Sequence, residues 1–256
     1  MDFIDFNCTI GHWPYEALGA ASAEEVFREL ERVGIKRAVF SSFGAIRGHT
    51  PTWDDANEKL FEEAERFPGM IPCPDIVPLI DGERGWANTA AYLDHLRARG
   101  AKTVRVSPAY NGFSVTADYF DGVLGYLERY RMPILIPRYD LPGGFDDVER
   151  LCKAHPQLPV VILENNHDNN RGMFFLLRRF PNLYFEISFL IEFGLPDKLV
   201  EFAGSRGLLF GTRTPFMEPA RMVARMAYGG FSEEDRYAIC CGNAERLLAE
   251  AGKERI

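Results

Sequence analysis

The chain has 256 residues, of which 46% are hydrophobic and 26% charged, and its formal net charge is −8 at pH 7. This length and apolar content suit a single domain over residues 1–256 with one large core. An acidic surface repels phosphate backbones, so we expect no nucleic-acid partner. No apolar run reaches the roughly 18 residues of a membrane span, and no signal peptide precedes the first strand, so we expect no membrane partner and a cytoplasmic location.

The five cysteines are odd in number and show no CxxC spacing. This pattern favours free, buried thiols in a reducing compartment over disulfides or a zinc cluster. Cys8 lies beside the candidate site described below, and a catalytic thiol there is a minor alternative that would need a histidine partner.

The first predicted strand covers residues 3–11 and ends in a polar tip. Asp5, Asn7 and Thr9 alternate with apolar residues, so on a regular strand they share one face. Burying three polar side chains costs free energy unless they are paired. They therefore form either a structural hydrogen-bond cluster or part of a site.

The chain then alternates helices with short apolar strands. Ser22 and Glu25 form a predicted capping box at the start of the first helix, and Gly34 ends it. Further strands are predicted at 37–42, 70–77, 103–107, 133–137, 159–164, 183–188 and 208–211. Further helices are predicted at 54–67, 86–99, 117–130, 145–154, 172–180, 196–203, 218–227 and 233–251, the last one broken at Gly242.

None of these strands shows the alternation of a half-exposed sheet, which is typical of parallel strands covered by helices. Eight strand–helix units in this length predict an α/β fold, a closed (β/α)8 barrel with an extra C-terminal helix. No phosphate-binding glycine motif follows any strand, so a nucleotide-binding sheet has no support.

In such a barrel the working residues lie at the C-terminal ends of the strands. Polar side chains converge at these ends, and three of them are arginines. They are Asn7, Thr9, Ser41, Ser42, Asp75, Arg105, Ser107, Arg138, Asn165, His167, Glu186, Ser188 and Arg213.

Six stretches resemble the amidohydrolase-related group of the amidohydrolase superfamily, whose members are metal-dependent (β/α)8 barrels. Residues 4–11 (IDFNCTIG) resemble the family opening Ile-Asp-x-His-x-His-x-Gly, and residues 209–216 (LFGTRTPF) resemble its Phe-Gly-Ser/Thr-Asp-x-Pro. The other stretches are 132–136 (MPILI), 159–165 (PVVILEN), 182–188 (NLYFEIS) and 241–248 (CGNAERLL). Their order and spacing together identify the chain as a member.

At the positions where this resemblance implies metal ligands, the chain carries other residues. They are Asn7, Thr9, Pro137, Asn165 and Arg213. None is a good zinc ligand, and Arg213 would bring a permanent positive charge to the place of the metal. We therefore expect no cofactor, although zinc or another divalent metal is what the family implies.

The candidate site residues follow from these positions. His12 or His167 would carry a proton, and Arg213 would stabilise negative charge. The expected ligand contacts are Asp5, Asn7, Thr9, Arg105, Arg138, Asn165 and Glu186. As an alternative, Arg213 forms an internal salt bridge to Asp5 or Glu186. Glu164 has the opposite parity to Asn165 and is expected to face the helices.

Three functions remain open. The first is a hydrolase or lyase that acts on a small anionic organic molecule without a metal. The second is a non-catalytic member that binds a metabolite or a partner. The third is a metal-dependent hydrolase with unusual ligands from Asp5, His12, Glu186 and His167. The expected partners are a small anionic ligand and, by resemblance to the family, a second copy of the chain in a homodimer.

Overall fold

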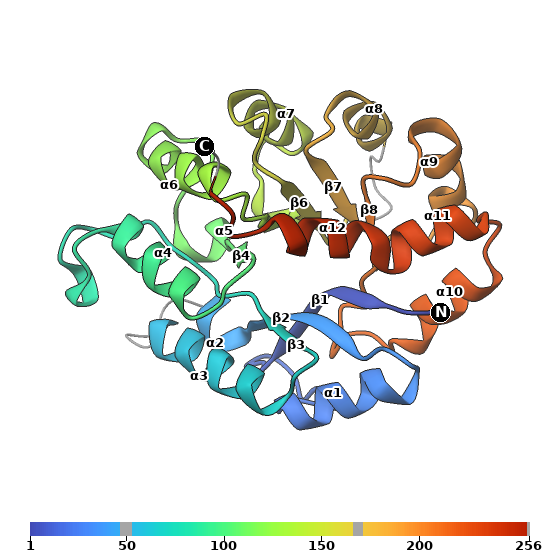
Figure 1. The fold of residues 1–256 in the computed structure, drawn as a ribbon, viewed down its shortest axis with the longest axis horizontal. Helices are drawn as coiled ribbons and strands as arrows, with labels where there is room; N and C mark the ends of the chain where they lie inside the picture. Colours follow the sequence, from blue (N-terminus) through green and yellow to red (C-terminus); the bar gives the residue numbers. More distant parts are fainter. Residues whose placement is uncertain (47–52, 166–170, 255–256) are drawn as a thin grey trace.

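The fold is taken from a computed structural model that describes residues 1–46, 53–165 and 171–254. Parallel strands form its centre and helices surround them (Figure 1). The strands are β1 (Ile4–Ile10), β2 (Arg37–Ser42), β3 (Met70–Pro72), β4 (Val104–Arg105), β5 (Ile134–Pro137), β6 (Val160–Leu163), β7 (Leu183–Glu186) and β8 (Leu208–Leu209).

These strands pair in sequence order, as β1-β2-β3 and as β4-β5-β6-β7-β8. Two isolated parallel bridges close the seams between the two groups, Cys8 with Thr214 and Asp75 with Arg105. At the second seam the Arg105 backbone N–H donates to the Pro74 carbonyl at 2.9 Å. The predicted α/β fold, a closed (β/α)8 barrel, is confirmed.

The helices form the outer ring and follow the strands along the chain. The α-helices are α1 (Ala23–Arg32), α2 (Phe43–Ile46), α3 (Trp53–Arg66), α4 (Thr89–Ala98), α5 (Pro108–Asn111), α6 (Asp118–Arg129), α7 (Phe145–Ala154), α8 (Arg171–Arg179), α9 (Leu195–Ala203), α10 (Ala220–Tyr228), α11 (Glu233–Tyr237) and α12 (Asn243–Glu250). Short 3-10 turns η1 (Glu83–Gly85) and η2 (Arg138–Asp140) accompany them. Across the described residues, none of the helices has the length and apolar content needed to cross a membrane.

Two local predictions differ from the structure. The strand expected at 70–77 ends at Pro72, because Pro72 and Pro74 lack the N–H groups that a ladder needs. The C-terminal helix is not broken at Gly242, whose φ and ψ of −58° and −40° are helical. Instead the π turn η3 (Ala238–Gly242) joins α11 to α12. The capping box is confirmed, with Ser22 Oγ accepting from the Glu25 N–H at 3.2 Å.

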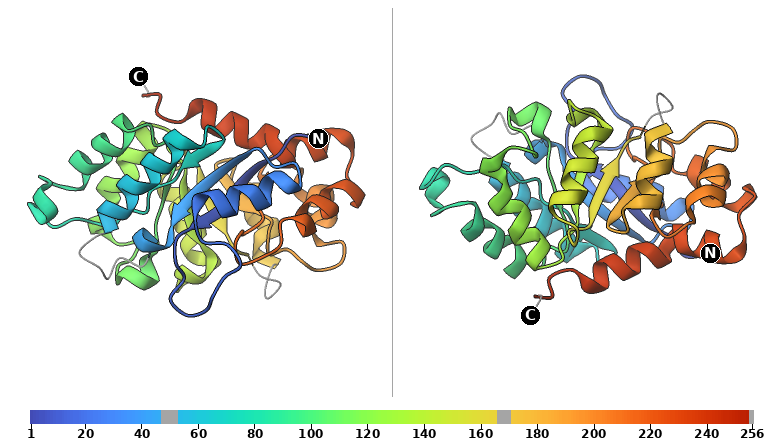
Figure 2. Two further views of the ribbon diagram at one scale, coloured as in Figure 1. Left: turned by 90° about the horizontal axis from the view of Figure 1, so that it is seen from below. Right: turned by 90° about the horizontal axis from the view of Figure 1, so that it is seen from above.

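Buried apolar side chains form two clusters. The larger lies between the strands and the helices, and the smaller fills the barrel interior. The interior cluster consists of Ile4, Phe6, Val39, Cys73, Leu135, Val161, Leu163, Tyr184, Leu209, Cys241, Ala244 and Leu247. Its last two members lie on α12, which runs across one end of the barrel, while the loop after β1 lies at the opposite end (Figure 2). Helix α12 therefore closes the base, and the strand ends open at the other side.

The polar tip of β1 departs from the predicted alternation. Ile4 and Phe6 belong to the interior cluster, but Cys8 belongs to the outer one. The β1–β2 register shifts between Asp5 and Cys8, which pair with Ala38 and Phe40, so β1 contains one extra residue there. Such a bulge reverses the side-chain parity. The prediction that Asp5, Asn7 and Thr9 share one face is therefore wrong.

Candidate functional site

The open end of the barrel begins with a buried polar layer around Glu186, the last residue of β7. The Asn7 amide Nδ2 donates to Glu186 Oε2 at 2.9 Å, and Ser188 Oγ donates to the same oxygen at 2.9 Å. The Ser188 backbone N–H donates to Oε1. Burial raises the pKa of Glu186 to about 7 despite these bonds. Two predicted contact residues, Asn7 and Glu186, are thus brought together.

Gly211 provides the space for that carboxyl group. A Cβ atom at this position would lie 2.2 Å from Glu186 Oε1, closer than any real contact. The glycine after β8 is therefore required by the side chain that β7 supplies, rather than by its own backbone conformation.

Asp5 is fully buried beneath this layer and fully bonded. Its Oδ1 accepts from the backbone N–H groups of Asn7 and Thr212, both at 3.0 Å, and Thr212 Oγ1 donates to its Oδ2. Burial raises the pKa of Asp5 above its ordinary value. These contacts match the structural alternative for Asp5, a hydrogen-bond cluster that joins β1 to the segment after β8.

A chain of ion pairs formed by Arg105, Glu164 and Arg213, the charged relay, crosses the open end from β4 to the loop after β8. Glu164 Oε2 lies 3.0 Å from Arg213 Nη2, and Glu164 Oε1 lies 3.8 Å from Arg105 Nη2. The side chains of Arg105 and Glu164 are 7% and 11% exposed, whereas that of Arg213 is 22% exposed. Arg213 is thus the member of the relay that reaches solvent most.

Two predictions about this relay are wrong. Glu164 does not face the helices, and the salt bridge of Arg213 is to Glu164 rather than to Asp5 or Glu186. The φ values of Glu164 and Arg213 are 57° and 60°, in the left-handed region. A left-handed residue at a strand end turns its side chain away from the direction that strand parity gives, so Glu164 reaches the mouth. Such strained conformations are concentrated at functional sites.

Aromatic rings enclose the outer end of the relay. The Arg213 guanidinium carbon lies 4.7 Å from the ring centres of both Phe189 and Phe216. Phe216 packs in turn against Trp13 and Phe43, at centroid distances of 5.1 Å and 5.3 Å. A cation against aromatic faces is favourable. Contacts with the Phe189 and Phe216 rings therefore help to hold the Arg213 side chain in position.

Two further buried carboxyl groups lie at the inner end of the relay. Asp75 follows β3, and its Oδ2 accepts from Ser107 Oγ at 2.7 Å. Burial raises the pKa of Asp75 to about 7, with Asp140 raising it further and Arg105 opposing. Burial likewise raises the pKa of Asp140 to about 6, with Glu164 adding to the rise. Both groups therefore change protonation state near neutral pH.

Several buried polar atoms in this region have no hydrogen-bond partner among the residues described. They are Asp75 Oδ1, Arg105 Nε, Asp140 Oδ2, Asn165 Oδ1 and Arg213 Nε. Native proteins leave few such groups unpaired, and a cluster of them marks a place where ligand or water atoms complete the bonding. This set defines the candidate site.

The other predicted site residues are placed as follows. Asn165 is 1% exposed and donates to the Ile162 carbonyl at 3.3 Å. Thr9 is buried, and its backbone N–H bonds the Thr214 carbonyl. Arg138 stacks on Phe145 at 4.7 Å, outside the relay.

The two histidine candidates gain no support from the geometry. His12 is exposed in the loop after β1, and His167 lies outside the described residues. Cys8, the minor thiol alternative, is buried, and its pKa is raised well above the ordinary value by burial and by Asp5. A raised pKa disfavours the thiolate that nucleophilic catalysis needs.

Sequence reasoning placed Asp75 among the polar residues at the strand ends but gave it no role in the site, and it did not select Asp140. Asp75 lies just after β3, in a segment that prolines interrupt. Asp140 lies in η2, three residues after the end of β5. Both residues follow barrel strands at the C-terminal end, and this position alone could have indicated that they belong to the site.

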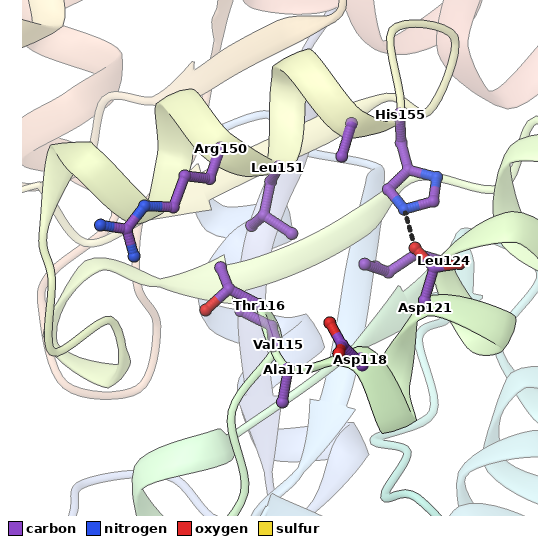
Figure 3. A pocket seen from close by; sticks show the side chains of 10 residues that line it. Val115, Thr116, Ala117, Asp118, Asp121, Leu124, Arg150, Leu151 and His155 are labelled. Atoms are coloured by element: carbon purple, nitrogen blue, oxygen red, sulfur yellow. Dashed lines mark hydrogen bonds and ion pairs between the residues drawn. The ribbon is translucent and has the colours of Figure 1, made fainter.

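A separate cavity of about 170 Å³ lies between α6 and α7 (Figure 3). His155 borders it, with Nε2 3.1 Å from Asp121 Oδ1 and Nδ1 3.2 Å from Glu128 Oε2. Both ring nitrogens are thus occupied by partners, which is the pattern of a structural histidine that joins two helices.

Comparison with known sequences decides the family. The amidohydrolase family profile matches residues 5–249, nearly the whole chain. The chain belongs to the amidohydrolase family. No curated protein matches it at a significant level.

Several solved structures share its fold. An uncharacterised TIM-barrel protein from Bordetella bronchiseptica superposes with a TM-score of 0.79 at 19% identity, covering 99% of this chain and 100% of that one. A 2,6-dihydroxybenzoate decarboxylase from Rhizobium superposes at 0.76 and 15% identity, covering 97% and 98%. A dihydroxybenzoic acid decarboxylase from Polaromonas, with bound manganese and the inhibitor 2-nitroresorcinol, superposes at 0.75 and 15% identity, covering 97% of each.

The prediction that no cofactor belongs to this barrel is contradicted by these relatives. The Polaromonas structure contains manganese, and so does a 5-carboxyvanillate decarboxylase from Novosphingobium aromaticivorans. In this chain, within residues 1–46, 53–165 and 171–254, no three His, Cys, Asp or Glu side chains are grouped to hold a metal ion. The amide and hydroxyl groups of Asn7, Thr9 and Asn165 are not the imidazole set of the family. The described residues do not fit such a centre.

Proposed function

We propose that this family member is a lyase that removes the carboxylate group of a small aromatic acid bound at the open end of the barrel. The observation that carries the proposal is Arg213, whose guanidinium lies against the rings of both Phe189 and Phe216. A guanidinium recognises a carboxylate through parallel N–H donors, and flanking rings accommodate a planar substrate. The decarboxylases with the same fold support this class of reaction.

The relay gives the site room for an added negative charge. Arg105 and Arg213 share the single carboxylate of Glu164, and the Nε–H groups of both arginines lack a partner among the described residues. Arg105 also faces the carboxyl groups of Asp75 and Asp140, so an incoming carboxylate would pair with the Arg213 guanidinium. Buried charges of this kind are stable only when they are paired, so an anion fits better than a neutral molecule.

The test is release of CO2 from 2,6-dihydroxybenzoate, 5-carboxyvanillate and benzoate, measured with and without added Mn²⁺. Arg213→Ala should lower kcat/KM by about 10- to 100-fold, the value of one charge-assisted hydrogen bond. The matched control is Arg225→Ala, because Arg225 also pairs with a carboxylate, that of Asp197, and lies 5.7 Å from an aromatic ring, that of Phe231, but on α10.

Arg213→Lys separates charge from geometry, since lysine keeps the charge but not the planar fork. Binding of the acids without CO2 release would overturn the lyase and support the non-catalytic alternative, a family member that only binds a small acid. No binding of any acid, or equal losses in the Arg213 and Arg225 variants, would overturn the carboxylate site itself.

A further inference from the structure

Loss of CO2 from a ring carboxylate leaves an electron pair on the ring carbon, which must be protonated. We propose that Asp75 is the proton donor, a catalytic residue, and that Arg105 and Asp140 control its charge. This inference rests on the proposed function and assigns a residue to the step that the arginine relay cannot perform, because a guanidinium does not release protons.

The bonding of Asp75 leaves one oxygen free to act. Its Oδ2 accepts from Ser107 Oγ at 2.7 Å, while Oδ1 is buried and has no partner among the described residues. The residue is 1% exposed. A buried carboxyl oxygen in this state requires either a ligand atom or a proton of its own with an acceptor.

The backbone of Asp75 is fixed on both sides. Asn57 on α3 accepts from the Asp75 N–H at 3.1 Å and donates to its carbonyl at 2.7 Å. The backbone of Arg105 bonds the residues on either side of Asp75. Its N–H donates to the Pro74 carbonyl at 2.9 Å, and its carbonyl accepts from the Ile76 N–H at 2.8 Å. A proton donor must be held at a fixed distance from the reacting atom, and this clamp supplies such rigidity.

The surrounding charges favour a proton on Asp75 before the reaction and a carboxylate after it. Burial and Asp140 raise the pKa of Asp75 to about 7, so that the acid form is well populated at neutral pH. Arg105 stabilises the carboxylate that forms when the proton leaves. The groups that interact with Asp75 electrostatically or by hydrogen bonding are Arg105 on β4, Ser107 after it, Asp140 in η2, Cys73 beyond β3 and Tyr92 on α4.

The proposed step balances with a proton from water as the only other reactant. The bond between ring carbon and carboxylate carbon breaks, CO2 leaves, and the electron pair stays on the ring carbon. Asp75 Oδ1–H transfers its proton to that carbon and becomes a carboxylate. Water then returns a proton to Asp75 at the start of the next turnover. No oxidation or reduction takes place.

The test compares Asp75→Asn with Asp55→Asn, a change on exposed α3 surface, in the full-length protein. Removal of a general acid typically lowers the rate by about 10²- to 10⁴-fold. We expect kcat to fall in this range with KM nearly unchanged. In the wild type kcat should also fall as pH rises through about 7, the pKa of Asp75, and this limb should be missing in the variant.

A second readout isolates proton transfer from bond cleavage. In D2O the wild type should exchange a ring hydrogen of resorcinol for deuterium, and Asp75→Asn should not, by NMR. Unchanged kcat and exchange in Asp75→Asn would overturn the donor role while leaving the carboxylate site intact if Arg213→Ala is still impaired.

A third readout does not need a substrate. Glu186 also titrates in this range, so difference infrared spectra of the wild type between pH 6 and pH 9 should show, beside the band of Glu186, a protonated carboxyl band that is lost on Asp75→Asn and kept in Glu186→Gln. Absence of that band at pH 6 would overturn the assignment even if no aromatic acid is turned over.

Discussion

At the residue scale, the side chains that face the open end could be named from their positions after strands, but their partners could not. Asn7, Glu186, Arg105 and Arg213 were all selected from the sequence, and the structure places them at this end. The pairing of Arg213 with Glu164 was missed because a φ of 57° at Glu164 cannot be derived from strand parity. Which residues are near a barrel mouth is set by topology, whereas which atoms meet is set by local backbone angles.

The contact between Gly211 and Glu186 gives a prediction at this scale. Gly211→Ala should lower the free energy of unfolding by about 1–3 kcal/mol, because the new methyl group overlaps a buried carboxyl that is held by hydrogen bonds from Asn7 and Ser188. Urea denaturation is the measurement.

Gly125→Ala is the matched control for that substitution. Gly125 lies inside α6, and a Cβ there would meet nothing within 4 Å, so the change should stabilise by roughly 0.5–1 kcal/mol through helix propensity. Equal destabilisation by the two alanines would show that the Glu186 contact is not the cause.

At the element scale, the order and type of the strands and main helices followed from apolar periodicity and from caps such as Ser22. The sequence could not show the bulge in β1 or the π turn before α12, since both insert one residue into a regular pattern without changing its composition. The short α5 was also missed, because four residues are too few for a periodic signal.

Helix α12 is attached to the barrel by Asn243, and this attachment can be tested. The Asn243 Nδ2 donates to the carbonyls of Ser205 and Leu208 at 2.8 Å and 2.7 Å, and the residue is 1% exposed. Asn243→Ala should cost about 1–3 kcal/mol of stability, because two buried carbonyls lose their donor.

Asn243→Asp should be worse than alanine, since a carboxylate would face the same two carbonyls without a donor. Thermal and urea unfolding of the two variants give the comparison. A smaller loss for aspartate than for alanine would contradict the hydrogen-bond account.

At the scale of the whole molecule, buried carboxyl groups control how stability depends on pH. Burial raises the pKa of Asp75 and Glu186 to about 7 and that of Asp140 to about 6, and it also raises that of Asp5. A raised folded-state pKa means that the folded protein holds the proton more tightly than the unfolded chain. The resulting stability is complete below about pH 4 and is lost as pH rises through 6 to 7.

We therefore expect the free energy of unfolding to fall between pH 5 and pH 8, by urea denaturation at each pH. Glu186→Gln should reduce this pH difference, because each titrating group contributes up to about 1.4 kcal/mol per pH unit. Glu62→Gln, at an exposed position, should leave the difference unchanged. Stability that rises toward pH 8 would contradict the raised pKa values.

The closure of the barrel base by α12 has a consequence for how the protein is made. The interior cluster includes Ala244 and Leu247 from α12, whereas Ile4 and Phe6 come from β1. During synthesis, β1 therefore leaves the ribosome well before α12, the helix that covers the base of the core. The barrel interior can exclude water only after α12 has been synthesised and has docked, so a chain truncated before Asn243 would expose an apolar base.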